Sequence, residues 1–304
     1  MWWNGVMQNV RVTRKGEHGL VHARVSFILA RNVPTAVVFR RGPSKWVQVL
    51  KWDTDTDTFE AGQWFHGKIY GRRSDLSPDG SMLVYFAQKI EGRTLQDTEY
   101  TYAWTAVSRP PYITALALWP KGDCWHGGGL FQDNKTLILN HRPDVAKPHP
   151  NHIPHGLQVI LKNHVHGEDD PLFSERLQRD GWDLKQEWVV ENRGYPLMFT
   201  TRQPEIREKR NLDGSMLIRL TRSIEDLDYA EEFAVSNGDG SVQIQIEWAS
   251  WVDWDLRGRL VFARDGRIFE GHIGDAKLQS SRELVDLNFA TPVPVRSPDW
   301  ASRW

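Results

Sequence analysis

Four similar turn-and-strand segments recur along this chain, and they constrain its fold more than any other feature. The string Asp-Gly-Ser-Met-Leu, followed by a β-branched residue, begins at Asp79 and again at Asp213. A third version spans 254–263, and a degenerate fourth spans 132–138. Each turn carries a residue that tolerates positive φ, as a tight hairpin requires: Gly80, Asn134, Gly214 and Gly258. The pattern predicts a mostly-β protein built from repeated hairpins.

Alternating and β-branched runs between these turns predict short strands. The clearest alternation, 241–248, places Val, Ile, Ile and Trp on one face and polar residues on the other. Two short helices are expected. One spans 170–177, with Pro171 in its first turn, and the other spans 223–233, with Ser223 as its capping residue. Further strands are predicted at 35–39, 46–52, 82–86, 136–139 and 260–263.

The spacing of the turns favours one architecture. Gly80 and Asn134 are 54 residues apart and Gly214 and Gly258 are 44 apart, intervals that suit four-stranded propeller blades. We therefore expect residues 1–304 to form a single all-β domain, a β-propeller of five blades with one or two short helices in insertions. Six blades, or a fold rich in β-sandwich sheets, are the alternatives. A His- and Pro-rich loop around 141–170 is expected to be an exposed insertion.

The segment 76–87 resembles the blade-opening strand of TolB-type and WD40-type β-propellers, and 52–64 resembles the outer hairpin of such blades. The resemblance covers about a third of the chain. It implies a rigid ring whose loops contact a protein partner. The expected function is a non-catalytic, intracellular protein-interaction scaffold or a subunit of a bacterial multiprotein complex.

Composition narrows the class of partner. The 38 Lys and Arg residues nearly balance the 39 Asp and Glu residues, which disfavours nucleic acid as a partner. Cys124 is the single cysteine, so no internal disulfide can form, and the amino terminus shows no secretory leader. Apolar runs are too short to span a membrane. We expect a cytoplasmic protein with a protein partner and no cofactor.

Six histidines within 141–166 raise the question of a metal site, because imidazole is a common metal ligand. His164 and His166 form the best candidate pair, since alternate residues of a strand share a face. No helical pair is present, and the many prolines favour an ordered polar loop without metal. The alternate carboxylates Asp53, Asp55 and Asp57 suit a calcium loop, but the Gly and the distal Glu of such loops are missing.

The alternative function is a carbohydrate-active, five-bladed propeller enzyme resembling glycoside hydrolases. Such enzymes need two carboxylates at a set separation, and the candidates are Asp75, Asp123, Glu247 and Asp253. The segment 124–129, Cys-Trp-His-Gly-Gly-Gly, resembles an esterase oxyanion loop, but no Gly-x-Ser-x-Gly elbow accompanies it. We interpret its glycines as allowing a close backbone approach.

Fifteen tryptophans are unusual, and we expect Trp64, Trp119, Trp188 and Trp248 to fill space between packed sheets. We predict no catalytic residues. The candidates for contact with a partner are Arg72, Arg73, Trp125, His126, His149, His152 and His155.

Overall fold

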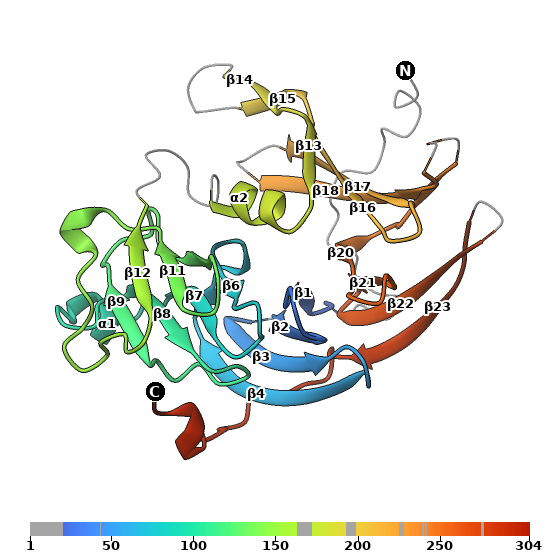
Figure 1. Cartoon of the computed structure of the whole chain (residues 1–304). Coiled ribbons are helices and arrows are strands. Elements are labelled where there is room, and N and C mark those ends of the chain that lie inside the picture. Colours follow the sequence, from blue (N-terminus) through green and yellow to red (C-terminus); the bar gives the residue numbers. More distant parts are fainter. Residues whose placement is uncertain are drawn as a thin grey trace.

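The computed structural model describes residues 21–42, 44–162, 172–192, 199–224, 228–238, 240, 242–274 and 277–304. Short antiparallel sheets dominate these ranges (Figure 1). This confirms the all-β prediction at the level of fold class. The helices are short: α1 (Gly92–Gln96), α2 (Leu172–Arg179) and the 3-10 turns η1 (Gly71–Arg73), η2 (Pro143–Val145) and η4 (Asp299–Ala301).

Two sheets are four-stranded meanders in which each strand pairs with the next one along the chain. Strongly apolar strands, such as that starting at Thr35, lie inside each meander, with both faces covered. The first sheet holds β1 (Arg24–Leu29), β2 (Thr35–Arg41), β3 (Trp46–Asp53) and β4 (Thr58–His66). The last sheet holds β20 (Ala249–Trp254), β21 (Leu260–Arg264), β22 (Arg267–Gly274) and β23 (Lys277–Asp286).

The second and third sheets follow the first along the chain. The second holds β5 (Lys68–Ile69), β6 (Asp75–Leu76), β7 (Leu83–Gln88), β8 (Ala103–Ser108) and β9 (Ala117–Pro120). The third holds β10 (Gly129–Phe131), β11 (Thr136–Leu139) and β12 (Gln158–Leu161). β12 pairs in parallel with β11, so part of the predicted 141–170 loop is a strand.

The fourth sheet contains the main departures from the sequence predictions. It holds β13 (Asp183–Gln186), β16 (Glu205–Arg210), β17 (Met216–Ile224), β18 (Asp228–Ser236) and β19 (Gln243–Gln245), beside a hairpin of β14 (Val189–Asn192) and β15 (Phe199–Gln203). The helix predicted over 223–233 is wrong, because β17 and β18 pair as a hairpin up to Ile224 and Asp228. Long-range pairing here overrides the local capping pattern. The predicted α2 is confirmed in its described part.

Each repeated turn joins two neighbouring strands of one sheet, at the edge of the third and last sheets but inside the fourth, where β13 lies outside β16. The turns join β6 to β7, β10 to β11, β16 to β17 and β20 to β21. Gly80, Gly214 and Gly258 have φ values of 68°, 89° and 74°, as predicted for tight turns that need a glycine. Asn134 is not among the residues with positive φ.

The buried core lies in clusters that join neighbouring sheets. One contains Val25 and Trp52 of the first sheet with Phe173 of α2 and Val261 of the last sheet. A second joins the first and second sheets, and a third joins the second and third. Trp119 is 1% exposed, which confirms its structural role, and Trp64 and Trp188 are partly buried.

Trp248 is half exposed, so the prediction that it fills space between sheets is wrong. The strand predicted over 241–248 ends at Gln245, and Trp248 has a φ of 61° outside it. The turn at Trp248 thus takes the ring away from the apolar face that the alternation assigned to it.

The segment after β23 returns along the other sheets and ends near β4 in Figure 1. Arg40 of β2 donates to the carbonyl of Leu287 at 3.0 Å, and Gln63 of β4 donates to the carbonyl of Val295 at 3.0 Å. Trp304 donates to the carbonyl of Leu116 at 3.2 Å. The segment therefore connects the last sheet, which it follows, to the first sheet and to the residue before β9 of the second sheet.

Candidate functional site

A cavity of about 240 Å³ runs along the outer edge of β1, with which no strand of the described residues pairs. Residues 24–28 of β1 form one wall, and a strand rises about 3.3 Å per residue, so the cavity is about 13 Å long on this side. It is larger than an apolar cavity of about 150 Å³, which already holds benzene. The other walls come from β2, β3, β5, η1, α2, β18 and β20: Phe39, Arg41, Val47, Ile69, Gly71, Arg72, Phe173, Arg176, Glu231, Ser250 and Trp251.

Two arginines lie at one end of this cavity. Arg24 and Arg41 are register partners on β1 and β2, so they sit directly opposite each other on one face of the sheet. Both side chains are exposed, and no carboxylate of the described residues pairs with either. Partial burial and the neighbouring Arg24 charge lower the pKa of Arg41. Like charges placed directly opposite destabilise a sheet, so this arrangement favours an anion between them.

The remaining charges of the cavity wall are already paired. Arg72 donates to Glu231 at 3.0 Å, and Arg219 of β17 donates to the same carboxylate. Arg176 of α2 donates to the carbonyl oxygen of Gly71 at 2.8 Å. With Arg24, Arg41, Arg72 and Arg176 against Glu231, the lining carries a formal charge of +3.

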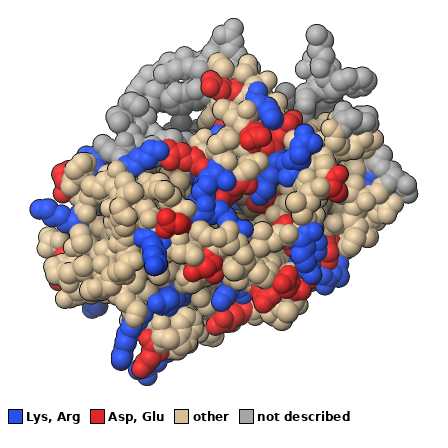
Figure 2. Space-filling view, viewed as in Figure 1, with Lys and Arg blue, Asp and Glu red and all other residues tan. Residues whose placement is uncertain are grey.

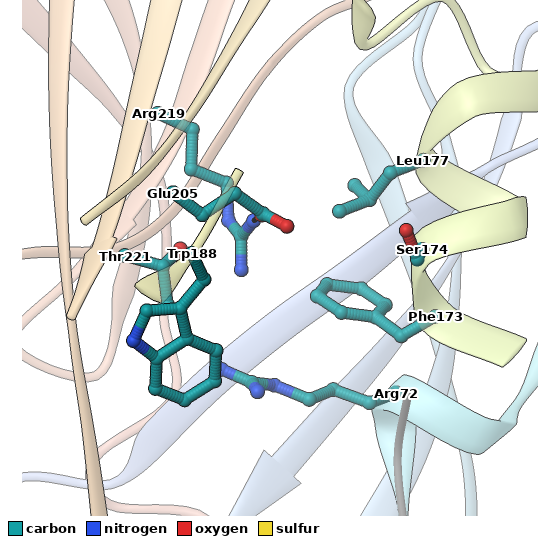
Figure 3. Close-up of a pocket in the computed structure, with 8 residues that line it drawn as sticks. All are labelled: Arg72, Phe173, Ser174, Leu177, Trp188, Glu205, Arg219 and Thr221. Atoms are coloured by element: carbon teal, nitrogen blue, oxygen red, sulfur yellow. Dashed lines mark hydrogen bonds and ion pairs between the residues drawn. The ribbon is translucent and has the colours of Figure 1, made fainter. Parts of the chain in front are cut away.

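Phe173 connects the cavity to a packed charge network behind it. Its ring points from α2 toward Arg219, with Arg72 below it (Figure 3). Guanidinium carbons of Arg72, Arg176 and Arg219 lie 5.0–5.1 Å from the ring centroid, within the range of cation–π attraction. The space beside Arg219 is only about 10 Å³, room for one water at most, so the ligand-sized space is the cavity along β1.

Arg179 fixes the helix that carries Phe173. It makes a bidentate pair with the fully buried Asp75 of β6, at 2.6 and 2.8 Å, and also donates to Asp180 and to the carbonyl of Phe131. Burial raises the pKa of Asp180. Lysine and arginine side chains, interleaved with acidic ones, cross the middle of this face of the molecule (Figure 2).

Of the two arginines predicted to contact a partner, the structure places only Arg72 at the cavity. Arg73 is fully buried and donates to the carbonyls of Cys124 and His126 at 2.7 and 2.6 Å. It therefore holds the 124–129 segment in place and is no part of an exposed surface.

The 124–129 segment approaches η1 closely, as its glycines suggested. A Cβ on Gly128 would lie 2.0 Å from the carbonyl oxygen of Arg73. Trp125 is 63% exposed, whereas burial lowers the pKa of His126, whose φ is 60°. The Sγ of Cys124 accepts a hydrogen bond from Gln88 at 2.7 Å.

Of the predicted loop histidines, His149 and His152 lie side by side, and none of the three lines the cavity. His149 is buried, stacks on Tyr100 at 4.1 Å and contacts Glu99 at 2.9 Å. His152 contacts the carbonyl of Ala115 at 3.0 Å, and His155 is exposed beside Trp304. The prediction that 141–170 is an exposed loop is therefore wrong at His149, which is buried.

The metal candidates His164 and His166 lie outside the described residues. Within the described ranges, no three His, Cys, Asp or Glu side chains come together in a way that could hold a metal ion. The calcium-loop carboxylates have other partners: Asp53 accepts from the backbone of Thr56 at 2.9 Å, and Asp57 pairs with Arg259 at 3.0 Å.

The carboxylates proposed for glycoside hydrolysis are held by cations or exposed. Asp75 pairs with Arg179, Asp123 with the buried Lys121, and Asp253 with Lys209 at 2.6 Å. Glu247 is exposed. None of the four lines the cavity along β1.

Sequence reasoning missed Arg24, Arg41 and Glu231. The alternation of 24–28 could have marked β1 as a strand, and Arg40-Arg41 at the end of β2 could have marked a cationic rim. Their meeting depends on strand register and on the placement of β18, which the sequence patterns did not indicate.

Comparisons with known proteins leave the family open. No protein-family model matches this chain, and no curated protein matches it. Among solved structures, it is similar to the AtxE2 isopeptidase, S527A variant, with Astexin3-dC4 bound, at 11% identity and a TM-score of 0.38. That match covers 88% of this chain, which spans about half (53%) of the isopeptidase chain. None of the helices in the described part of the chain has the length and apolarity that a membrane crossing requires.

Proposed function

We propose that this chain is a non-catalytic, propeller-like binding protein whose central cavity receives an anionic group of a protein partner. Five sheets would serve as the blades. Support comes from hydrogen bonds between the turns of neighbouring sheets, as expected if those turns share a common rim. They join Asn32 N to Pro78 O (3.0 Å), Asp79 N to Asn134 Oδ1 (3.0 Å), Asn211 Nδ2 to Gly258 O (3.1 Å) and Arg257 Nη2 to Thr54 O (2.8 Å).

Helix α2 supplies the remaining link of the ring. Arg179 reaches Phe131 of the third sheet, while Ser174 accepts a hydrogen bond from Arg207 of the fourth sheet. The helix thus bridges the third and fourth sheets, where no contact between turns is found among the hydrogen bonds of the described residues. This placement brings Phe173 and Arg176 to the cavity wall.

The observation that carries the proposal is the pair of exposed, opposed guanidiniums of Arg24 and Arg41 at a cavity. Arginine recognises carboxylate and phosphate groups through its planar fork of donors. The described residues that line the cavity include no His, Cys, Asp or Lys, and Glu231 is paired with Arg72, which favours binding over catalysis.

Affinity purification from the native host tests this function. The wild type is compared with Arg24→Gln/Arg41→Gln, and with Arg93→Gln as a control, because Arg93 is exposed on α1 and does not line the cavity. We expect one partner to be retained by the wild type and the control and lost from the double variant. Partners retained equally by all three proteins would contradict a role for the cavity.

A further inference from the structure

The geometry points to the group that the cavity accepts: we propose that it is the carboxyl-terminal residue of a partner chain, carrying an apolar side chain. This inference rests on the proposed function and adds the chemical class of the ligand. Three observations of the described residues support it.

The exposed cations of the lining, which have no acidic partner among the described residues, lie at one end of the cavity. Arg24 and Arg41 are exposed there, whereas Arg72 is paired with Glu231 and Arg176 is occupied by backbone carbonyls. A single anionic group at this end therefore meets two open guanidinium forks, while a second anion further in would meet Arg72, which is paired with Glu231, and Arg176, whose donors are occupied by carbonyls. A ligand with one terminal carboxylate fits this distribution better than a polyanion.

Part of the cavity lining is apolar. Ile28 and Phe39 come from the first sheet and Ile69 from the second, and all three are nearly buried. Phe173 and Trp251 line the opposite side. An apolar side chain entering about 240 Å³ of such space would be removed from water, which stabilises the complex by about 25 cal/mol per Å² of apolar surface buried.

The edge of β1 offers backbone groups to an extended peptide. Ser250 donates to the carbonyl of Val25 at 2.7 Å, so that carbonyl points away from β2 but is itself already occupied. Backbone groups of an antiparallel strand alternate with a period of two, so those of Phe27 face the same side. No strand of the described residues pairs with β1 there, and a peptide can pair with such an edge through its main chain. This feature favours a peptide over a free organic acid.

Peptide binding measured by fluorescence anisotropy tests the inference. The probes share a fluorescein-labelled Gly/Ser spacer and end in Leu, Ile, Val, Met or Phe, each as a free acid and as an amide. A matched peptide ends in Gly. We expect at least one apolar free acid to bind the wild type and Arg93→Gln at least ten-fold more tightly than its amide and than the Gly peptide. In Arg24→Gln/Arg41→Gln the advantage of the acid over the amide should fall below two-fold.

Two further arms separate failure of the inference from failure of the function. 3-Phenylpropionate competing as strongly as the peptide would assign the site to free acids and overturn the peptide ligand. Equal binding of acid and amide would also overturn it. If no peptide binds, but inorganic phosphate raises the melting temperature of the wild type and not of the double variant, the cationic site stands and the peptide inference fails. If no peptide binds and phosphate changes the melting temperatures of both proteins equally, both the peptide inference and the proposed function fail.

Discussion

Replacing Arg179 by Met should strongly destabilise the protein, because this arginine anchors α2 to two sheets. Its guanidinium makes five hydrogen bonds, two to Asp75, two to Asp180 and one to Phe131. An arginine has five N–H donors, so all of them are used. Asp75 is fully buried and would keep only the backbone N–H of Phe131 as a partner.

The magnitude follows from leaving a buried carboxylate without its cation. Breaking a buried pair by removing one partner costs about 3–5 kcal/mol, a large part of the stability of a typical domain. Replacing Asp75 as well by an apolar residue costs far less, because it removes the fully buried carboxylate and leaves only the partly exposed Asp180 without its cation. We expect Asp75→Leu/Arg179→Met to recover at least half of the loss in Arg179→Met.

Urea unfolding followed by tryptophan fluorescence measures this double-mutant cycle, provided that the slope with denaturant is unchanged. An exposed pair, Arg142 with Asp144, serves as the matched control and should contribute no more than about 1 kcal/mol. Equal unfolding midpoints for the wild type and Arg179→Met would refute the reasoning. So would a double variant less stable than the single one.

Three other experiments, with five substitutions, test the structural account. Trp119→Ala should cost about 3–5 kcal/mol through the cavity it leaves, whereas Trp248→Ala, at a half-exposed ring, should cost less than about 1 kcal/mol in the same unfolding assay. Burial lowers the pKa of His141 to about 4, so the unfolded chain binds a proton near pH 6.5 that the folded chain does not. Stability should therefore fall by about 2 kcal/mol between pH 7 and pH 5 from this group, and His141→Gln should remove that part of the loss; an unchanged pH dependence would contradict the burial argument. Gly128→Ala should lower the melting temperature sharply because its Cβ would meet backbone, and Gly92→Ala, with open space around it, should not.

The local features of the fold were predictable from the sequence where a repeat or an alternation reported directly on the backbone. The turn glycines Gly80, Gly214 and Gly258 need positive φ, and the recurring turn motif in the sequence indicates that need. Strands such as 35–39 are strongly apolar, so burial and propensity agree there. The helix expected over 223–233 failed because pairing between β17 and β18 decides the conformation there.

The candidate site was less accessible to prediction. Arg72 was identified, but Arg24 and Arg41 become a site only through the register of β1 on β2, and Glu231 reaches the cavity from a distant strand. The buried histidines show the opposite error. His141 and His149 resembled polar loop residues, yet each is satisfied by a hydrogen bond inside the fold, to Thr105 at 2.8 Å and to Glu99 at 2.9 Å.

The account is tested most directly by locating a bound ligand. Crystals of the wild type soaked with a peptide that ends in 4-bromophenylalanine as a free acid would reveal the bromine through its anomalous scattering. We predict one peak among Ile28, Phe39 and Ile69, with the carboxylate between Arg24 and Arg41, and no peak in crystals of Arg24→Gln/Arg41→Gln. A bromine bound outside this cavity, or bound equally in both proteins, would contradict the assignment of the cavity as the binding site.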